Sequence, residues 1–273
     1  YPAMSGGYES SVPGLWIAGT LMHGNDWRKS SGGFIHGVRY LVRALSNILE
    51  LENYGTTWPS QLVSVQAESI QEEDASVAAM RDYVELATSI LRRSSEMSGP
   101  YQMFSVLMDV YVFSSDGNCR RFDEIPVQYM PTFLRLMNLS SSAAEADIDR
   151  TPHYIAVTFE YGESYSGPGS DTLSSSRVVR PFPLASKNGP GSEGNFIHPV
   201  LYHGCYDKKS CKYASNHDER IPHRSAVYHV AEDIHTTYLR PRIDIGPLAD
   251  HLHKHDALWY RHQERKLQSL TQP

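Results

Sequence analysis

Two glycine-rich turns near the start of the chain are the residues best suited to hold a ligand. Gly19-Thr20 ends the short apolar run at residues 16–18, and Gly32-Gly33 precedes a helical pattern that begins with Phe34. Because glycine has no Cβ, the backbone there can approach a ligand closely, and a helix N-terminus favours negative charge. The order strand, glycine turn, loop and helix therefore predicts a place for an anionic cofactor. An ordinary α/β unit, whose glycines serve only packing, fits the same spacing equally well.

The helix after Gly33 is predicted by apolar residues that recur every three or four positions. Such residues share one face of a helix: Phe34, Val38, Leu41, Leu45 and Ile48. His36 lies one turn into this helix, where it could hydrogen-bond a cofactor or substrate, or simply pack.

The rest of the chain predicts a mixture of helices and strands. Val77, Met80, Val84, Ala87 and Leu91 share a second helical face. Residues 101–113 and 121–129 form two strand-like runs around a turn sequence, and residues 153–161 and 196–202 form two more. We also expect helices at 131–139 and 245–270, a segment at 227–239 that is ambiguous but favours helix, and a long irregular loop at 170–195.

Two other clusters of titratable residues are weaker candidates for a functional site. On a helix, His251 and His255 share a face while His253 does not, so we expect a solvated surface and no metal site. His229, Glu232 and His235 could also share a helical face, with the same interpretation. No catalytic residue can be named from the sequence.

Composition excludes two broad classes of function. The 273 residues carry 25 Lys and Arg against 31 Asp and Glu, and the resulting net charge of −6 does not favour nucleic acid as a partner. No apolar run approaches the roughly 20 residues that span a bilayer. The chain starts with Tyr1 and has no signal-peptide pattern. We expect the N-terminal part of a larger protein to be missing.

Cysteines and a sequon give weak hints about the compartment. Cys205 and Cys211 could form a disulfide in an oxidising compartment or remain two ordinary thiols, and Cys119 stands apart from them. Asn138 begins an Asn-Leu-Ser glycosylation sequon. No Cys-x-x-Cys pair for dithiol exchange is present.

The segment Val12-Pro13-Gly14-Leu15-Trp16-Ile17-Ala18-Gly19 resembles the last flavin-contacting strand of flavoproteins with two dinucleotide-binding domains. This class includes thioredoxin reductases and flavin-containing monooxygenases. In the class the strand typically ends in Gly-Asp, and the Asp binds the ribityl or pyrophosphate part of FAD. Here Thr20 takes that place, so the resemblance implies a hydroxyl contact to the ribityl chain instead.

The chain as a whole resembles a family of FAD-dependent oxidoreductases of the endoplasmic reticulum that is associated with protein degradation. The resemblance rests on segments scattered over residues 1–239: 30–40, 101–104, 122–128, 160–162, 166–168, 195–200 and 229–233. It implies FAD as cofactor and NAD(P)H as electron donor in the lumen of the endoplasmic reticulum. It also implies disulfide reductases and lectin or adaptor proteins as partners in clearing misfolded glycoproteins. Gly19, Thr20, Gly32, Gly33, Phe34 and His36 would then bind the cofactor, and Asn138 would be glycosylated.

This resemblance divides the chain into two predicted parts. Residues 1–52 would be an α/β strand-turn-helix, the C-terminal part of an FAD-binding Rossmann-like domain, and residues 53–273 an α+β accessory domain for docking partners. No predicted strand-to-helix turn in this sequence carries a Gly-x-Gly-x-x-Gly loop to hold pyrophosphate. We therefore expect this polypeptide alone to bind FAD weakly and to be inactive. The alternative function is a non-catalytic protein-interaction module with a vestigial flavin half-site.

Overall fold

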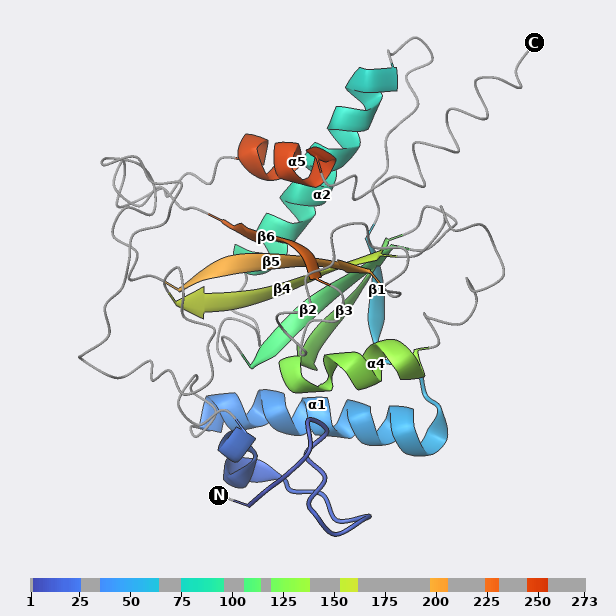
Figure 1. Cartoon of the computed structure of the whole chain (residues 1–273), viewed down its shortest axis with the longest axis vertical. Helices are drawn as coiled ribbons and strands as arrows, with labels where there is room; N and C mark the ends of the chain where they lie inside the picture. Colours follow the sequence, from blue (N-terminus) through green and yellow to red (C-terminus); the bar gives the residue numbers. More distant parts are fainter. Residues whose placement is uncertain are drawn as a thin grey trace.

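The computed structural model describes residues 2–25, 35–63, 75–95, 106–113, 119–137, 153–161, 197–205, 224–230 and 245–254. The helices are η1 (Gly19–Asn25), α1 (Ile35–Tyr54), α2 (Ala75–Ser95), η2 (Val127–Tyr129), α4 (Met130–Leu136) and α5 (Ile245–Lys254), where η marks a 3-10 helix. The strands are β1 (Ser60–Val63), β2 (Leu107–Phe113), β3 (Cys119–Pro126), β4 (His153–Tyr161), β5 (Ile197–Cys205) and β6 (Arg224–His229). Figure 1 shows them arranged around one central sheet.

The sheet is six-stranded, with the order β1-β3-β2-β4-β5-β6. Every pairing between these strands is antiparallel. The described elements therefore form a mixed fold of helices and an antiparallel sheet. A Rossmann-like arrangement, which needs parallel strands joined by crossover helices, is not confirmed by them.

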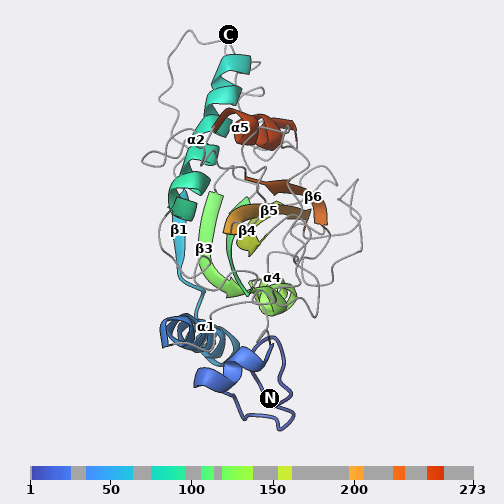
Figure 2. The same cartoon turned by 90° about the vertical axis from the view of Figure 1, so that its left-hand side faces the viewer.

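Helices cover both faces of the sheet and create two cores. Figure 2 shows α1 and α4 below the sheet and α2 and α5 above it. On the α1 side, Val110, Val112 and Tyr154 pack with Leu41 and Ile48. On the other side, a second cluster joins α2 and α5 to the sheet through Tyr83, Ile90, Tyr111, Ile155 and Leu252. Alternate residues of β2 and β4 thus enter opposite cores, as the two-residue period of a strand requires.

The helix predicted after Gly33 is confirmed as α1, and its apolar face enters the first core. Leu41, Leu45 and Ile48 are buried there, and Gly55 (φ 67°) follows the end of the helix. The proposed domain boundary at residues 52/53 stays a prediction. Side chains from both sides of it nevertheless share this one core.

The predicted strand at residues 16–18 is wrong as a sheet strand. Trp16 forms only an isolated antiparallel bridge with Glu9, in a small hairpin whose turn is Pro13-Gly14. Leu15 N–H donates to Val12 C=O at 3.1 Å and Gly14 has φ 79°, so residues 12–15 form a tight turn ahead of Trp16. The residues from Gly19, expected to begin a loop, form η1 instead.

Most of the remaining predicted elements are confirmed, with two corrections. The hairpin of β2 and β3, the helix α4, the strands β4 and β5, and a helix from Ile245 are present. On α2 the buried face contains Tyr83, Leu86 and Ile90, whereas Val84, expected inside, is 39% exposed. Residues 227–229, expected to be helical, belong to strand β6. Residues 170–195, 231–239 and 255–270 lie outside the described residues. No helix within the described ranges is long and apolar enough to cross a bilayer.

Candidate functional site

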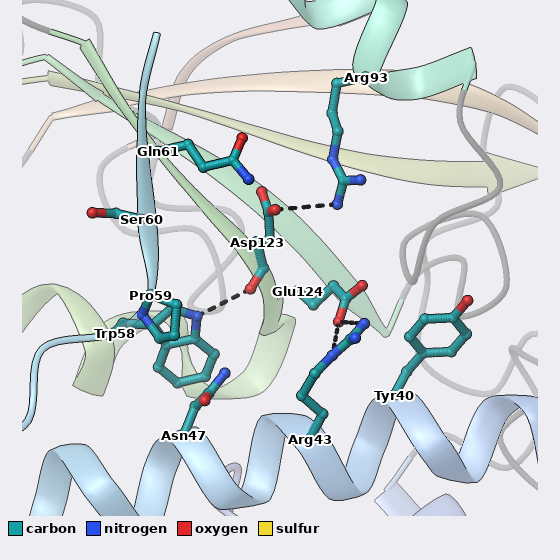
Figure 3. Close-up of a pocket in the computed structure, with 10 residues that line it drawn as sticks. All are labelled: Tyr40, Arg43, Asn47, Trp58, Pro59, Ser60, Gln61, Arg93, Asp123 and Glu124. Atoms are coloured by element: carbon teal, nitrogen blue, oxygen red, sulfur yellow. Dashed lines mark hydrogen bonds and ion pairs between the residues drawn. The ribbon is translucent and has the colours of Figure 1, made fainter.

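A pocket of about 530 Å³ lies at the β1–β3 edge of the sheet, between α1 and the end of α2. Figure 3 shows side chains from four elements and a connecting segment entering it. Its lining is polar and contains both signs of charge: Tyr40, Arg43 and Asn47 of α1, Trp58 and Pro59, Ser60 and Gln61 of β1, Arg93 of α2, and Asp123 and Glu124 of β3.

A β-bulge in the β2–β3 pair brings the acidic residues together. Met108 pairs with Ile125 and Val110 with Phe122, so Asp109 alone stands opposite both Asp123 and Glu124. A bulge of this kind bends a strand and turns its side chains in new directions. Here it brings Asp109 of β2 beside the consecutive residues Asp123 and Glu124 of β3, next to one pocket.

Asp109 is the buried centre of this arrangement. Its Oδ1 accepts a hydrogen bond from the backbone N–H of Glu124 at 3.0 Å, and its Oδ2 accepts one from Arg93 Nε at 2.7 Å. The residue is only 3% exposed. Burial raises the pKa of the Asp109 carboxyl to about 6, although the charge of Arg93 opposes this rise. One carboxylate therefore fixes both a strand backbone and a helix side chain.

Glu124 adopts an uncommon backbone conformation and connects the sheet to α1. Its φ is 61°, a left-handed value that costs a residue with a Cβ about 1–2 kcal/mol. The Glu124 carboxylate accepts hydrogen bonds from Nε (2.8 Å) and Nη2 of Arg43. The Arg43 guanidinium also lies 5.2 Å from the ring centre of Tyr40.

Asp123 directly precedes Glu124 in the bulge and connects the pocket to β1 through Arg121. Arg121 Nε donates to Asp123 Oδ1 at 2.7 Å, and Arg121 Nη2 donates to the Gln61 side chain at 2.7 Å. Arg93 Nη2 is 3.6 Å from Asp123 Oδ2. The buried indole of Trp58 donates to the Asp123 carbonyl at 3.0 Å. These contacts make the wall of the pocket continuous from α2 to β1.

The residues singled out from the sequence lie elsewhere or outside the described residues. Gly19 has φ 79° and no heavy atom within 4 Å of a Cβ built on it, and Thr20 is exposed. Neither lines the pocket. The described residues exclude Gly32, Gly33, Phe34, Asn138 and Cys211, together with the side chains of His36 and Cys205. The predicted cofactor-binding set is therefore not tested by this structure.

The described histidines of α5 make ring contacts with β5, β6 and α2, whereas His255 lies outside the described residues. Nε2 of His251 lies 3.1 Å from Nε2 of buried His203 on β5, and Tyr228 packs on the His251 ring. His253 packs edge-on against Tyr83 of α2. Among the described residues, no group of three or more His, Cys, Asp or Glu side chains could hold a metal ion.

The pocket residues themselves were missed by the sequence analysis. Arg43 lies off the apolar face predicted for its helix, and Asp109 and Glu124 lie within apolar strand patterns. Acidic residues in such patterns were the available signal, because a carboxylate is rarely buried without a partner. Their partners, however, are 16 and 81 residues away in the sequence.

Comparison with known proteins agrees with the family suggested by the sequence. The chain is 32% identical over 257 residues to FAD-dependent oxidoreductase domain-containing protein 2 of Mus musculus, an alignment that covers 91% of this chain and 33% of the mouse protein. The protein of the same name from Danio rerio is 29% identical over 279 residues, which cover 99% of this chain and 35% of that protein. No family model matches the chain, and no solved structure matches it significantly. The chain is therefore homologous, over most of its own length, to proteins named FAD-dependent oxidoreductase domain-containing protein 2, and it spans about a third of the length of these relatives.

Proposed function

We propose that this chain is part of an FAD-dependent oxidoreductase that takes electrons from NAD(P)H in the lumen of the endoplasmic reticulum. The observation that carries this proposal is the similarity over 91–99% of the chain to relatives named as FAD-dependent oxidoreductases. The proposed role is in the degradation of misfolded glycoproteins, with disulfide reductases and lectin or adaptor proteins as partners. A flavin supplies a group that accepts a hydride and passes electrons on, which such a role requires.

The described residues offer a partial fit to FAD. Gly19 leaves its backbone open to a close neighbour, and the exposed hydroxyl of Thr20 follows it. In the proposed site these two residues contact the flavin, together with Gly32, Gly33, Phe34 and His36. The one Gly-x-Gly-x-x-Gly match in the sequence, Gly189 to Gly194, lies outside the described residues, and no described strand leads into a helix through such a loop to grip the pyrophosphate. In the proposed enzyme, firm binding of FAD would require a pyrophosphate loop that the described residues do not supply.

The proposed partners follow from the chemistry that the chain itself carries. It has no Cys-x-x-Cys pair, and buried Cys119 is its one described free cysteine. Dithiol exchange would then use a pair of thiols on a partner protein. The sequon at Asn138 supports a lumenal site, where such triplets are glycosylated.

The test is flavin retention in the full-length protein that contains this chain. Gly19→Val and Gly33→Val should each lower the ratio of bound flavin to protein, because a branched side chain blocks close backbone approach. Gly14→Val is the matched control for Gly19, since Gly14 has the same φ of 79° and equally open surroundings. The control therefore suffers the same backbone strain without touching the proposed flavin site.

The outcomes separate the two candidate functions. If the full-length protein is colourless and cannot be reconstituted with FAD, the enzyme proposal fails and the non-catalytic interaction module takes its place. If Gly19→Val keeps its flavin as well as Gly14→Val does, Gly19 is not part of the site. The melting temperature of each variant, measured in parallel, shows whether flavin loss reflects the site or unfolding.

A further inference from the structure

Two arginines enter the pocket from helices on opposite faces of the sheet. Arg43 comes from α1 and Arg93 from α2, and both line the same cavity. Figure 3 shows them approaching each other across β3, with Glu124 between them. Guanidinium groups that converge in this way suit a planar or tetrahedral oxyanion, because each offers several N–H donors in a fixed plane.

In two of the ion pairs at the pocket, the order of burial places the arginine towards the cavity and its carboxylate partner behind it. The Arg43 side chain is 57% exposed, whereas the side chain of its partner Glu124 is 8% exposed. The Arg93 side chain is 12% exposed and that of its partner Asp109 is 5% exposed. In both pairs a buried carboxylate orients a guanidinium from behind. A ligand that enters the pocket therefore meets the arginine of each pair first.

Glu124, the partner of Arg43, has a strained backbone conformation. Glu124 has φ 61°, and its N–H is fixed by the buried carboxylate of Asp109. Strain of this kind persists where surrounding contacts enforce it, and it is common at binding sites. Its effect here is to aim the Glu124 carboxylate at Arg43. Arg43 uses Nε and Nη2 for that contact, and its Nη1 group has no partner within the described part of the chain.

We propose that this pocket binds the oxyanion of a small ligand, a carboxylate or a phosphate, with Arg43 as the principal donor. The pocket volume of about 530 Å³ lies in the range of about 300–1,000 Å³ that is usual for small-molecule sites. Asn47, Ser60 and Gln61 add neutral polar groups that can orient the rest of the ligand. This inference does not depend on flavin binding, since it is argued from the pocket residues alone; Gly19 and Thr20, the proposed flavin residues whose surroundings are described, do not line the pocket.

A cationic ligand is the competing occupant. Among the lining residues, Asp123 has the one partly exposed carboxylate, since its side chain is 32% exposed. This carboxylate already contacts Arg121 and Arg93. A cation there would also lie close to both lining arginines. Trp58 is only 2% exposed, so its ring offers no open surface for a cation–π contact. The exposed charge thus favours an anion.

The test measures binding of three probes to the purified full-length protein by titration calorimetry at constant ionic strength. The probes are inorganic phosphate, succinate and propylammonium. We expect saturable binding of phosphate or succinate, and the tighter of the two identifies the natural ligand as a phosphate or a carboxylate. Arg43→Gln should weaken that binding by at least about tenfold, since a hydrogen bond to a charged group contributes this much. Arg43→Lys should bind with an affinity between those of the wild-type protein and Arg43→Gln, because lysine keeps the charge but lacks the planar guanidinium.

Arg39→Gln is the matched control, because Arg39 is exposed on the same helix and does not line the pocket. It should bind the probes as the wild-type protein does. The proposal is overturned if Arg43→Gln binds both anions normally, if Arg39→Gln loses affinity equally, or if neither anion binds saturably at millimolar concentration. Binding of propylammonium alone would assign the pocket to a cation instead. None of these outcomes depends on whether the protein retains flavin.

Discussion

Replacing Asp109 with Asn tests which force governs the buried network beneath the pocket. Two effects oppose each other at this carboxylate: burial disfavours its charge, while Arg93 at 2.7 Å favours it. Burial is the larger effect, and the pKa of Asp109 rises from 3.8 to about 6. Asn has nearly the shape of the protonated acid and never ionises. The substitution therefore removes the titration and keeps an oxygen that can accept the Glu124 N–H.

The sign of the effect follows from proton linkage. An acid with a higher pKa in the folded chain binds its proton more tightly when folded, so it contributes most stability below its unfolded pKa. That contribution is complete below about pH 4 and is lost as the pH rises through about 6. The difference between 3.8 and about 6 corresponds to about 3 kcal/mol in the free energy of unfolding.

The measurement is urea unfolding of the wild-type protein and Asp109→Asn from pH 4 to pH 7. The Asn amide that faces Arg93 costs about 1–3 kcal/mol at every pH, because two donors then meet. The informative quantity is therefore the change with pH in the difference between variant and wild type, in which other titrating groups cancel. We expect the variant to gain about 2.5 kcal/mol relative to wild type between pH 4 and pH 7, most of the full linkage value. A constant difference, or one that falls with pH, would show that the Arg93 pair outweighs burial and would refute the reasoning.

Two further predictions concern the strands around the pocket. Because Glu124 has φ 61°, Glu124→Gly should be about 0.5–1 kcal/mol more stable than Glu124→Ala, the reverse of an ordinary strand position. Both variants lose the Arg43 contact, so the difference between them in urea unfolding reports the backbone strain alone. A more stable Ala variant would contradict this explanation. Cys119 is buried and its pKa is raised, mainly by burial. An alkylating reagent should therefore label it only after denaturation, as mass spectrometry of its peptide can show, and rapid labelling of the native protein would disprove its burial.

The spacing of apolar residues was sufficient to predict those helices in which one regular period sets the buried face. The α1 face of Leu41, Leu45 and Ile48 was predicted correctly, because these residues recur at three- and four-residue spacing and enter one core. On α2, apolar residues occur at 83, 84, 86, 87, 90 and 91, so two overlapping stripes are available. Packing against α5 and the sheet selects the stripe with Tyr83 and Ile90 and leaves Val84 exposed. The helix was predictable from the sequence, whereas its exact orientation depends on tertiary contacts.

Strand pairing explains the other errors. Residues 224–229 become strand β6 because β5 offers a free edge to them, and this partner is distant in the sequence. Trp16 finds its partner in Glu9, so an apolar run that looked like a sheet strand ends in a local hairpin. The bulge at Asp109 is a mismatch between two strands, and neither strand shows it alone. The candidate pocket was therefore not predictable from spacing, since its charges are brought together by that mismatch.

Helix α1 connects the proposed flavin site with the pocket and also keeps them apart. Gly32 and Gly33 precede its first residue, Ile35, and Arg43 lies eight residues further along. At a rise of about 1.5 Å per residue, this separation is about 12 Å along the axis. Arg43 and the backbone at the helix N-terminus are therefore separated by about two turns of helix. Because α1 is a single helix anchored in the core by Leu41 and Ile48, a shift of the helix would move both sites together. Flavin retention and anion binding therefore test separate properties of this chain.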